Sequence, residues 1–224
     1  MKFELRREWP AFAALALMVI VTLIVYSRLP EPMPTHWNAA GEVDGYSSRL
    51  VGAWLIPLTS AALYLLLLVI PRIDPRRKNV ERFSDVYALM RVGFVLFMAF
   101  VQGAIFYAVL TQNDAAVGWL MPVGVGMLFI LIGNYMPRVR SNWFMGIRTP
   151  WTLSSDRVWR NTHRLGGRLF IVVGLLLMLT ALMPAEWIVW VLMGSVLLLS
   201  AGMFAYSWWD YQRVEGAQPP DSDL

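Results

Sequence analysis

The sequence contains no cysteine and only two histidines, and charged side chains make up 15% of its 224 residues. Without cysteine, the chain has no disulfide, no thiol nucleophile and no thiolate metal site. The His-Glu-x-x-His, Gly-x-Ser-x-Gly and Walker patterns of metalloproteases, serine hydrolases and nucleotide-binding proteins are also missing. We therefore expect a protein that is not an enzyme and that uses no cofactor and no metal.

Hydrophobic residues account for 58% of the chain and gather in blocks. A helix of about 20 apolar residues crosses roughly 30 Å of hydrocarbon. The first block, Ala11 to Tyr26, is longer than the apolar core of a signal peptide and precedes a proline-rich loop, so we interpret it as a retained span. The pattern predicts an all-α, polytopic membrane helical bundle with about six transmembrane helices, at residues 10–28, 50–71, 86–111, 116–136, 167–184 and 186–208.

Lysine and arginine in the short loops predict the orientation of this bundle, because positively charged loops stay in the cytoplasm. Only Arg28 and Arg49 fall on one side, and Arg91 lies early in the third span. The side that holds both termini takes sixteen: Lys2, Arg6, Arg7, Arg72, Arg76, Arg77, Lys78, Arg82, Arg138, Arg140, Arg148, Arg157, Arg160, Arg164, Arg168 and Arg213. We therefore expect an N-in/C-in protein with a cytoplasmic loop at residues 137–166.

This inner loop is the most specific stretch of the sequence. Asn134 and Pro137 end the fourth span, and residues 142–151 are aromatic but not helical in pattern, so we expect them to fold back against the bundle. Ser154 or Ser155 then caps an amphipathic cytoplasmic helix. A basic stripe follows one face of that helix, and Trp159 and His163 lie together beside it; the stripe is Arg157, Arg160, Arg164 and Arg168. Gly166-Gly167 is expected to form a hinge before the fifth span.

The outer loop, residues 29–49, is the only sizeable segment expected on the external side. Its proline-rich start predicts an extended chain, and its Asn, Gly and Asp-Gly residues predict turns. The loop is interpreted either as a binding segment or as a short ordered hairpin that caps the bundle. Its candidate functional residues are His36, Trp37, Asn38 and Asp44.

The interior of the bundle is expected to hold almost no ionisable groups, with Gln102 and Asn134 as its main buried polar residues. Carboxylates inside the membrane mark ion pathways and proton relays. Because the spans show none, the sequence argues against a proton-driven transporter.

Two sets of motifs resemble one family of membrane proteins. The inner set is Gly133-Asn134, Pro137, Asn142, Gly146 to Thr152, Val158-Trp159 and Thr162-His163. It resembles the signature of the SdpI family of bacterial membrane immunity proteins. The outer set, Pro34 to Gly41 with Asp44-Gly45-Tyr46, resembles the uncharacterised N-terminal module often fused to that family. The resemblance implies an N-terminal module at 1–112, an SdpI-like module at 113–212 and a flexible tail at 213–224.

The same resemblance implies a function and a location. The founding member of the family protects its producer against a secreted killing peptide and holds a winged-helix, ArsR-type repressor at the membrane. A multi-pass protein of the bacterial cytoplasmic membrane is therefore implied, with a peptide toxin outside, a repressor inside and no direct contact with nucleic acid. The residues implied to bind or signal in the inner loop are Asn134, Asn142, Arg148, Thr149, Pro150, Trp151, Trp159 and His163.

Three functions remain open from the residues themselves. The first is a binding and sensing protein with ordered polar segments on both faces. The second is a small-molecule or lipid transporter, consistent with six spans. The third is an intramembrane enzyme that would use His163 and Asp156, which lie about two helical turns apart but have no accompanying nucleophile.

Overall fold

A computed structural model describes residues 4–184 and 186–215, and its dominant feature is six long helices. Each is long and apolar enough to cross a membrane. They are α1 (Leu5–Val25), α2 (Arg49–Ile73), α4 (Ser84–Thr111), α5 (Ala115–Tyr135), α7 (Asp156–Thr180) and α8 (Glu186–Glu215). The predicted all-α polytopic membrane bundle is confirmed. Lys2 and residues 216–224 of the predicted tail lie outside the described residues, whereas residues 213–215 belong to α8.

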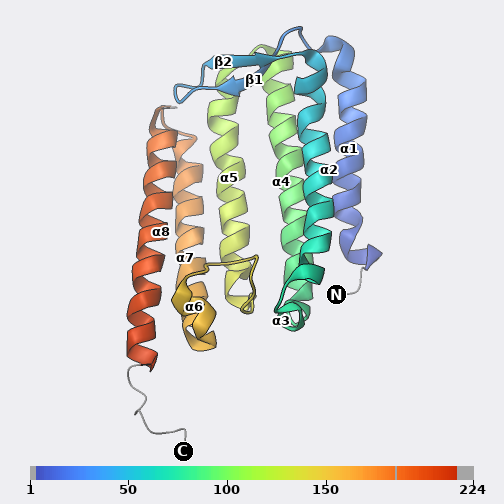
Figure 1. Cartoon of the computed structure of the whole chain (residues 1–224). Coiled ribbons are helices and arrows are strands. Elements are labelled where there is room, and N and C mark those ends of the chain that lie inside the picture. Colours follow the sequence, from blue (N-terminus) through green and yellow to red (C-terminus); the bar gives the residue numbers. More distant parts are fainter. Residues whose placement is uncertain (1–3, 185, 216–224) are drawn as a thin grey trace, which may run out of the picture.

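Short elements close the two ends of the bundle (Figure 1). At one end, strands β1 (Met33–Trp37) and β2 (Val43–Ser47) form an antiparallel hairpin after a short helix, η1 (Tyr26–Arg28). At the other end lie α3 (Arg77–Glu81), η2 (Met136–Arg138) and α6 (Pro150–Ser154). We call these the hairpin end and the terminal end, because α1 begins and α8 ends at the latter. The outer loop is therefore a short ordered hairpin that caps the bundle, as the second of its two interpretations predicts.

The helices form two groups of three that meet along α4 and α5. Helices α1 and α2 pack against α4, while α7 packs against α5 and α8 packs against α7. The predicted module boundary at residues 112 and 113 falls in the turn between α4 and α5. Helix α8 contacts its neighbours through a narrow face, and most of its large apolar side chains are exposed, as expected for a helix that faces lipid.

Helices α5 and α7 approach each other through glycines. A Cβ atom on Gly133 would lie 2.5 Å from the carbonyl oxygen of Gly167, and one on Gly126 would lie 2.5 Å from that of Gly174. The predicted hinge at Gly166-Gly167 is therefore wrong, because α7 runs unbroken from Asp156 to Thr180. These glycines let the backbones of α5 and α7 come close. The predicted amphipathic helix and the fifth span are one continuous helix.

The interior near the terminal end contains an ion pair. Arg91 of α4 and Glu8 of α1 are each only 2% exposed, and the arginine donates to both carboxylate oxygens. The hydroxyl of Tyr64 on α2 donates to the same carboxylate over 3.0 Å. The expectation that the bundle holds no buried carboxylate is wrong, because Glu8, which lies among the charges of the N-terminus in the sequence, sits inside the bundle in the first turn of α1. The ion pair and the Tyr64 hydroxyl together join α1, α2 and α4, the three helices of the first group.

The two expected polar residues of the interior have different surroundings. Gln102 is buried and donates to the hydroxyl of Thr22 over 2.7 Å and to the carbonyl of Met18 over 3.1 Å. Asn134 is exposed on the outside of α5, so its predicted burial is wrong. Helical phase explains the difference, because the neighbouring Gly133 occupies the face of α5 that meets α7.

Candidate functional site

The chain between α5 and α7, residues 136–155, is organised by one buried side chain. We call it the α5–α7 segment. The carboxamide of Asn142 donates to the carbonyls of Arg140 (2.8 Å) and Met145 (2.9 Å). Its oxygen accepts from the amides of Phe144 (2.9 Å) and Met145 (2.6 Å). Asn142 is only 1% exposed, so these bonds replace those that a regular helix would supply to the buried backbone.

An Asn142→Asp substitution is expected to loosen this turn, because aspartate keeps the accepting oxygen but loses both donors. The lost bonds and the facing carbonyl oxygens should cost about 1.5–3 kcal/mol locally. Amide hydrogen exchange at Phe144 and Met145 should then accelerate by roughly 10- to 100-fold. An Asn113→Asp change at an exposed site of the hairpin end is the control, and equal exchange in both variants would contradict this role.

His163 and Trp159 pin the segment to α7. Nε2 of His163 accepts from the amide of Ile147 (3.0 Å), and Nδ1 donates to the carbonyl of Trp159 (2.8 Å). Both contacts are met by the neutral tautomer with its hydrogen on Nδ1. The two rings stack at 4.0 Å, and the indole of Trp159 donates to the carbonyl of Val139 (2.8 Å). Both side chains are fully buried, so in this arrangement they hold the segment in place.

Gly146 makes the contact between Ile147 and His163 possible. Its φ of +110° is a conformation that glycine adopts without strain, and a Cβ atom there would collide with Nε2 of His163. The expected irregular fold-back of the aromatic stretch is thus confirmed, with Met145 packed against the core beside Trp159.

The Thr149-Pro150-Trp151-Thr152 stretch forms the start of α6, a short helix that the sequence pattern did not predict. The Thr149 hydroxyl accepts from the amide of Thr152 (3.2 Å), and the Thr152 hydroxyl accepts from the amide of Thr149 (2.9 Å). Pro150 occupies the first helical position, where no amide donor is needed. Thr149 also donates to Ser207 of α8 (3.0 Å), and the Trp151 ring meets Phe204 of α8 edge-on at 4.9 Å.

The arginines of this region face outward. Arg157, Arg160, Arg164 and Arg168 are all exposed along one face of α7, as the spacing predicts, and Ser155 caps the helix. Arg148 is exposed as well, and its guanidinium donates to the carbonyl of Trp143. The structure therefore brings Asn142, Thr149, Trp151, Trp159 and His163 together as a scaffold, leaves the basic stripe free on the surface and places Asn134 apart from both.

Residues between α2 and α4 hold the segment from the other side, and sequence reasoning missed them. The buried Asp74 accepts from the amides of Arg76 (2.7 Å) and Trp143 (3.1 Å). Arg76 donates to the hydroxyl of Ser141 and to the carbonyl of Leu153 (2.8 Å). Asn79 donates to the carbonyl of Ser141 (2.9 Å). The only local signal is the turn-forming Asp74-Pro75 dipeptide; the partners are more than 60 residues away along the chain.

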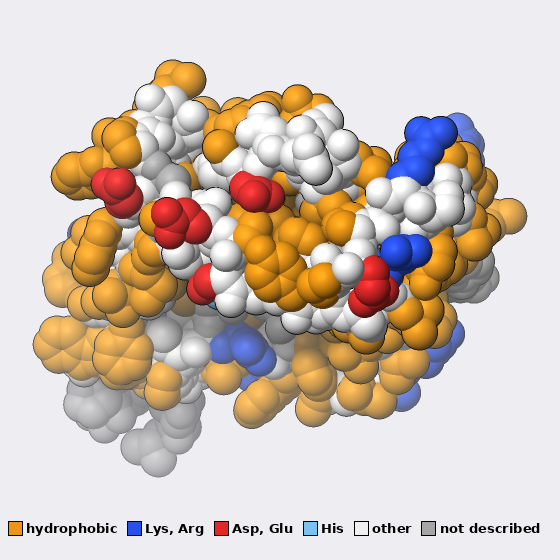
Figure 2. Space-filling model, turned by 90° about the horizontal axis from the view of Figure 1, so that it is seen from above, with side chains coloured by type: hydrophobic (Ala, Val, Ile, Leu, Met, Phe, Trp, Pro, Cys, Tyr) orange, Lys and Arg blue, Asp and Glu red, His pale blue; other side chains and the backbone are white. Residues whose placement is uncertain are grey.

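The hairpin end carries the four predicted outer residues. Nδ1 of His36 lies 2.5 Å from a carboxylate oxygen of Asp44 across the two strands. The Asn38 carboxamide accepts from the amides of Ala40 (2.9 Å) and Glu42 (3.0 Å), so it stabilises the turn. The Trp37 ring packs against the α4 and α5 ends. Figure 2 views this end, where acidic side chains lie scattered among apolar ones.

Two family models match different parts of the chain. Residues 138–207, from the α5–α7 segment to α8, match the SdpI/YfhL protein family. Residues 13–60, which include the hairpin, match a domain of unknown function, DUF1648. The two matches lie in the two different groups of helices.

Comparison with individual proteins finds one long match and one short match. The chain is 23% identical over 202 residues to Immunity protein SdpI of Bacillus subtilis (strain 168), covering 90% of this chain and 94% of that protein. It is 50% identical over 36 residues to an uncharacterized protein of Archaeoglobus fulgidus, covering 16% of this chain and 20% of that protein. No solved structure matches the chain significantly. The chain is therefore similar to the SdpI/YfhL family over residues 138–207 and to Immunity protein SdpI over most of its length.

Proposed function

We propose that this protein makes its cell resistant to a secreted antimicrobial peptide, as an integral protein of the bacterial cytoplasmic membrane. The observation that carries the proposal is the similarity to Immunity protein SdpI, which extends over 90% of the chain and so includes both polar ends of the bundle. A match confined to the apolar spans would carry little functional information. The distribution of lysine and arginine supports an orientation with the terminal end in the cytoplasm.

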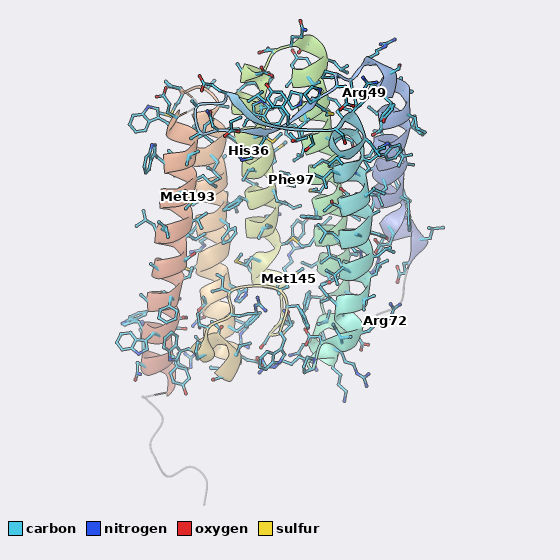
Figure 3. All side chains as sticks on the ribbon, turned by 45° about the horizontal axis from the view of Figure 1, so that its top comes forward. His36, Arg49, Arg72, Phe97, Met145 and Met193 are labelled. Carbon is cyan, nitrogen blue, oxygen red and sulfur yellow. The ribbon has the colours of Figure 1, made fainter. Side chains whose placement is uncertain are left out.

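In this orientation the two ends have separate tasks. The hairpin end meets an arriving peptide first. Its described residues include the exposed carboxylates Glu31, Glu42, Asp44, Asp114 and Glu186, against two cations, Arg28 and Arg49. Figure 3 shows His36 and Arg49 at this end and Arg72 and Met145 toward the other. The α5–α7 segment then contacts partners inside the cell.

The basic stripe on α7 suits a cytoplasmic protein partner. Four guanidinium groups are exposed on one face of this helix. Each is planar and can bind a carboxylate through two parallel hydrogen bonds. Capture of a winged-helix repressor by this stripe would couple toxin exposure to transcription without any contact between this protein and DNA.

Immunity can be tested in a Bacillus subtilis strain from which SdpI has been deleted, exposed to the toxin against which that protein confers immunity. We expect the wild-type chain to restore survival. Arg148→Ala and Trp151→Ala should each lower protection about 10-fold, because Arg148 loses its hydrogen bond to the carbonyl of Trp143 and Trp151 loses its ring contact with Phe204. A tenfold change corresponds to about 1.4 kcal/mol.

Membrane levels of both variants should stay unchanged, which an immunoblot of membrane fractions would check. Arg72→Ala and Trp9→Ala remove exposed side chains of the same types elsewhere, and they serve as matched controls. Full protection by both segment variants would rule out a role for this segment in immunity.

A further inference from the structure

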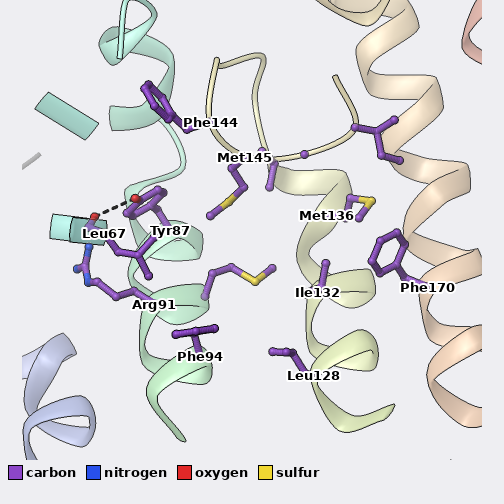
Figure 4. Close-up of a pocket in the computed structure, with 14 residues that line it drawn as sticks. Leu67, Tyr87, Arg91, Phe94, Leu128, Ile132, Met136, Phe144, Met145 and Phe170 are labelled. Atoms are coloured by element: carbon purple, nitrogen blue, oxygen red, sulfur yellow. Dashed lines mark hydrogen bonds between the residues drawn. The ribbon is translucent and has the colours of Figure 1, made fainter. Parts of the chain in front are cut away.

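An apolar cavity lies where the two groups of helices meet, next to the terminal end. Its volume is about 490 Å³, and its walls come from α2, α4, α5, α7 and the α5–α7 segment. Figure 4 shows Phe94 of α4 on one side and Leu128 of α5 on the other, with Phe144 and Met145 of the segment across one end. We call it the junction cavity. Small-molecule sites commonly have volumes of roughly 300–1,000 Å³ and lie at boundaries between structural units.

The depth of the junction cavity matches the acyl-chain region of one leaflet. Its α4 wall runs from Tyr87 to Phe94, three to ten residues into a helix that begins at Ser84. At about 1.5 Å per residue, this wall lies roughly 5–15 Å from the helix start. Half of a hydrocarbon core is about 15 Å thick. The cavity is therefore at the depth where lipid chains are the most abundant apolar groups.

The lining is almost entirely apolar. Among the described residues of the wall, Arg91 is the only charged one. Its Nε and Nη2 donate to Glu8 of α1, while its buried Nη1 has no hydrogen-bond partner among the described residues. The remaining side chains are aliphatic, aromatic or methionine, apart from the phenol of Tyr87, which donates to the carbonyl of Leu67 (2.8 Å). A bound water needs two to four polar partners, and the side chains of this wall offer few beyond Nη1 of Arg91. A flexible hydrocarbon chain fits such a lining.

Three cations flank the end of the junction cavity that the segment covers. Arg138 and Arg140 are the chain neighbours of the lining residue Val139, and Arg148 is the neighbour of the lining residue Ile147. All three are exposed. Guanidinium groups bind phosphate through paired hydrogen bonds, and anionic lipids enrich the cytoplasmic leaflet. The arrangement places positive charge where the headgroup of a lipid would lie if its chain entered the cavity.

We propose that the junction cavity is a lipid site that takes one acyl chain of an anionic phospholipid, with the phosphate held by the Arg138 and Arg140 side chains. The acyl chain fills the space between the two groups of helices and packs against Phe144 and Met145 of the α5–α7 segment. Because acyl chains are equally well solvated in the bilayer, the arginines supply the selectivity and the cavity supplies the position. The α5–α7 segment then forms only partly from protein contacts, and lipid composition affects it directly.

Native mass spectrometry of the purified full-length protein tests this site, with dioleoyl phosphatidylglycerol and dioleoyl phosphatidylcholine as probes. We expect the wild type to retain one phosphatidylglycerol and to bind it at least about tenfold more tightly than phosphatidylcholine, as paired charge-assisted hydrogen bonds would produce. Leu128→Trp fills the cavity and should abolish retention, whereas Leu175→Trp on the exposed face of α7 should not.

Charge variants keep the test decisive if Leu128→Trp does not fold. The double variant Arg138→Gln/Arg140→Gln changes only exposed side chains and should bring the two lipids to equal affinity. Arg157→Gln/Arg160→Gln removes the same charge from the basic stripe and should leave the preference intact. Equal lipid preference in both double variants, or retention unchanged in a folded Leu128→Trp protein, would overturn the proposal. Because binding is measured on purified protein, the result is independent of immunity.

Discussion

A Gly133→Ala substitution is expected to destabilise the bundle by about 1–3 kcal/mol, in line with other overpacked interiors. The added methyl group would lie 2.5 Å from the carbonyl oxygen of Gly167, and a methyl on Gly167 would lie 2.6 Å from that of Gly133. A flexible side chain could rotate away from such a clash, but a backbone carbonyl inside a helix cannot. Helices α5 and α7 would have to separate, and the α5–α7 segment that they carry would shift with them.

The same contact recurs seven residues away along each helix. A methyl group on Gly126 would lie 2.5 Å from the carbonyl oxygen of Gly174, and one on Gly174 would lie 2.6 Å from that of Gly126. Seven residues are about two helical turns, so both contacts lie on one face of each helix. The double variant Gly133→Ala/Gly126→Ala should destabilise the bundle more than either single variant. Neither clash can be relieved while the other contact holds the two helices close together.

Unfolding in mixed detergent micelles measures this effect, with Gly103→Ala and Gly194→Ala as matched controls. A Cβ atom at either control position meets no heavy atom within 4 Å. Alanine forms helix better than glycine by about 1 kcal/mol, so the controls should be neutral or slightly stabilised. If Gly133→Ala also proved neutral, the close approach of α5 and α7 would be refuted.

A Glu8→Ala substitution should cost about 3–5 kcal/mol, because it leaves the buried Arg91 guanidinium without its counter-charge. Arg91 is 2% exposed and also lies over the rings of Tyr64 and Tyr87, at 5.7 and 5.5 Å from their centroids. These aromatic contacts offset only part of the loss. We expect a lower unfolding midpoint and a lower level of the protein in membranes.

A double variant separates loss of the charge pair from loss of packing. Glu8→Leu combined with Arg91→Met removes both charges and should recover most of the lost stability, since well-packed apolar side chains often replace a buried ion pair without cost. Glu4→Ala removes an exposed carboxylate that lies just before α1 and pairs with Arg7 in its first turn, and it should change stability by less than about 1 kcal/mol. A cost of Glu8→Ala no larger than that of Glu4→Ala would show that the buried pair is not important.

The sequence indicates which residues gather in the candidate site more completely than it indicates what each of them does. Asn142, Thr149, Trp151 and His163 stand out in the sequence as polar or bulky groups between apolar spans, and the structure places them together. Their common role as a scaffold was not predicted, because it depends on Ile147 reaching His163 and Thr149 reaching Ser207 of α8. Propensity and spacing carry no information about such partners.

The errors have related causes. Gly166-Gly167 suggested a hinge because glycine is a weak helix former, but close contact with α5 holds this part of α7 helical. Asn134 looked buried because it follows a long apolar run, yet a helix has an outer face along its whole length. Glu8 looked solvated because it lies among the charges of the N-terminus.

Hydropathy and composition are enough to establish six spans and the exposed arginine face of α7, because both follow from the period of one helix and the thickness of a bilayer. The motifs in the sequence are also enough to indicate the family. The Glu8–Arg91 pair joins residues 83 positions apart, and the junction cavity combines side chains from four helices and a loop. Which helix faces which is set by the summed packing of whole surfaces, down to single glycine contacts, and that sum exists only once the helices have assembled.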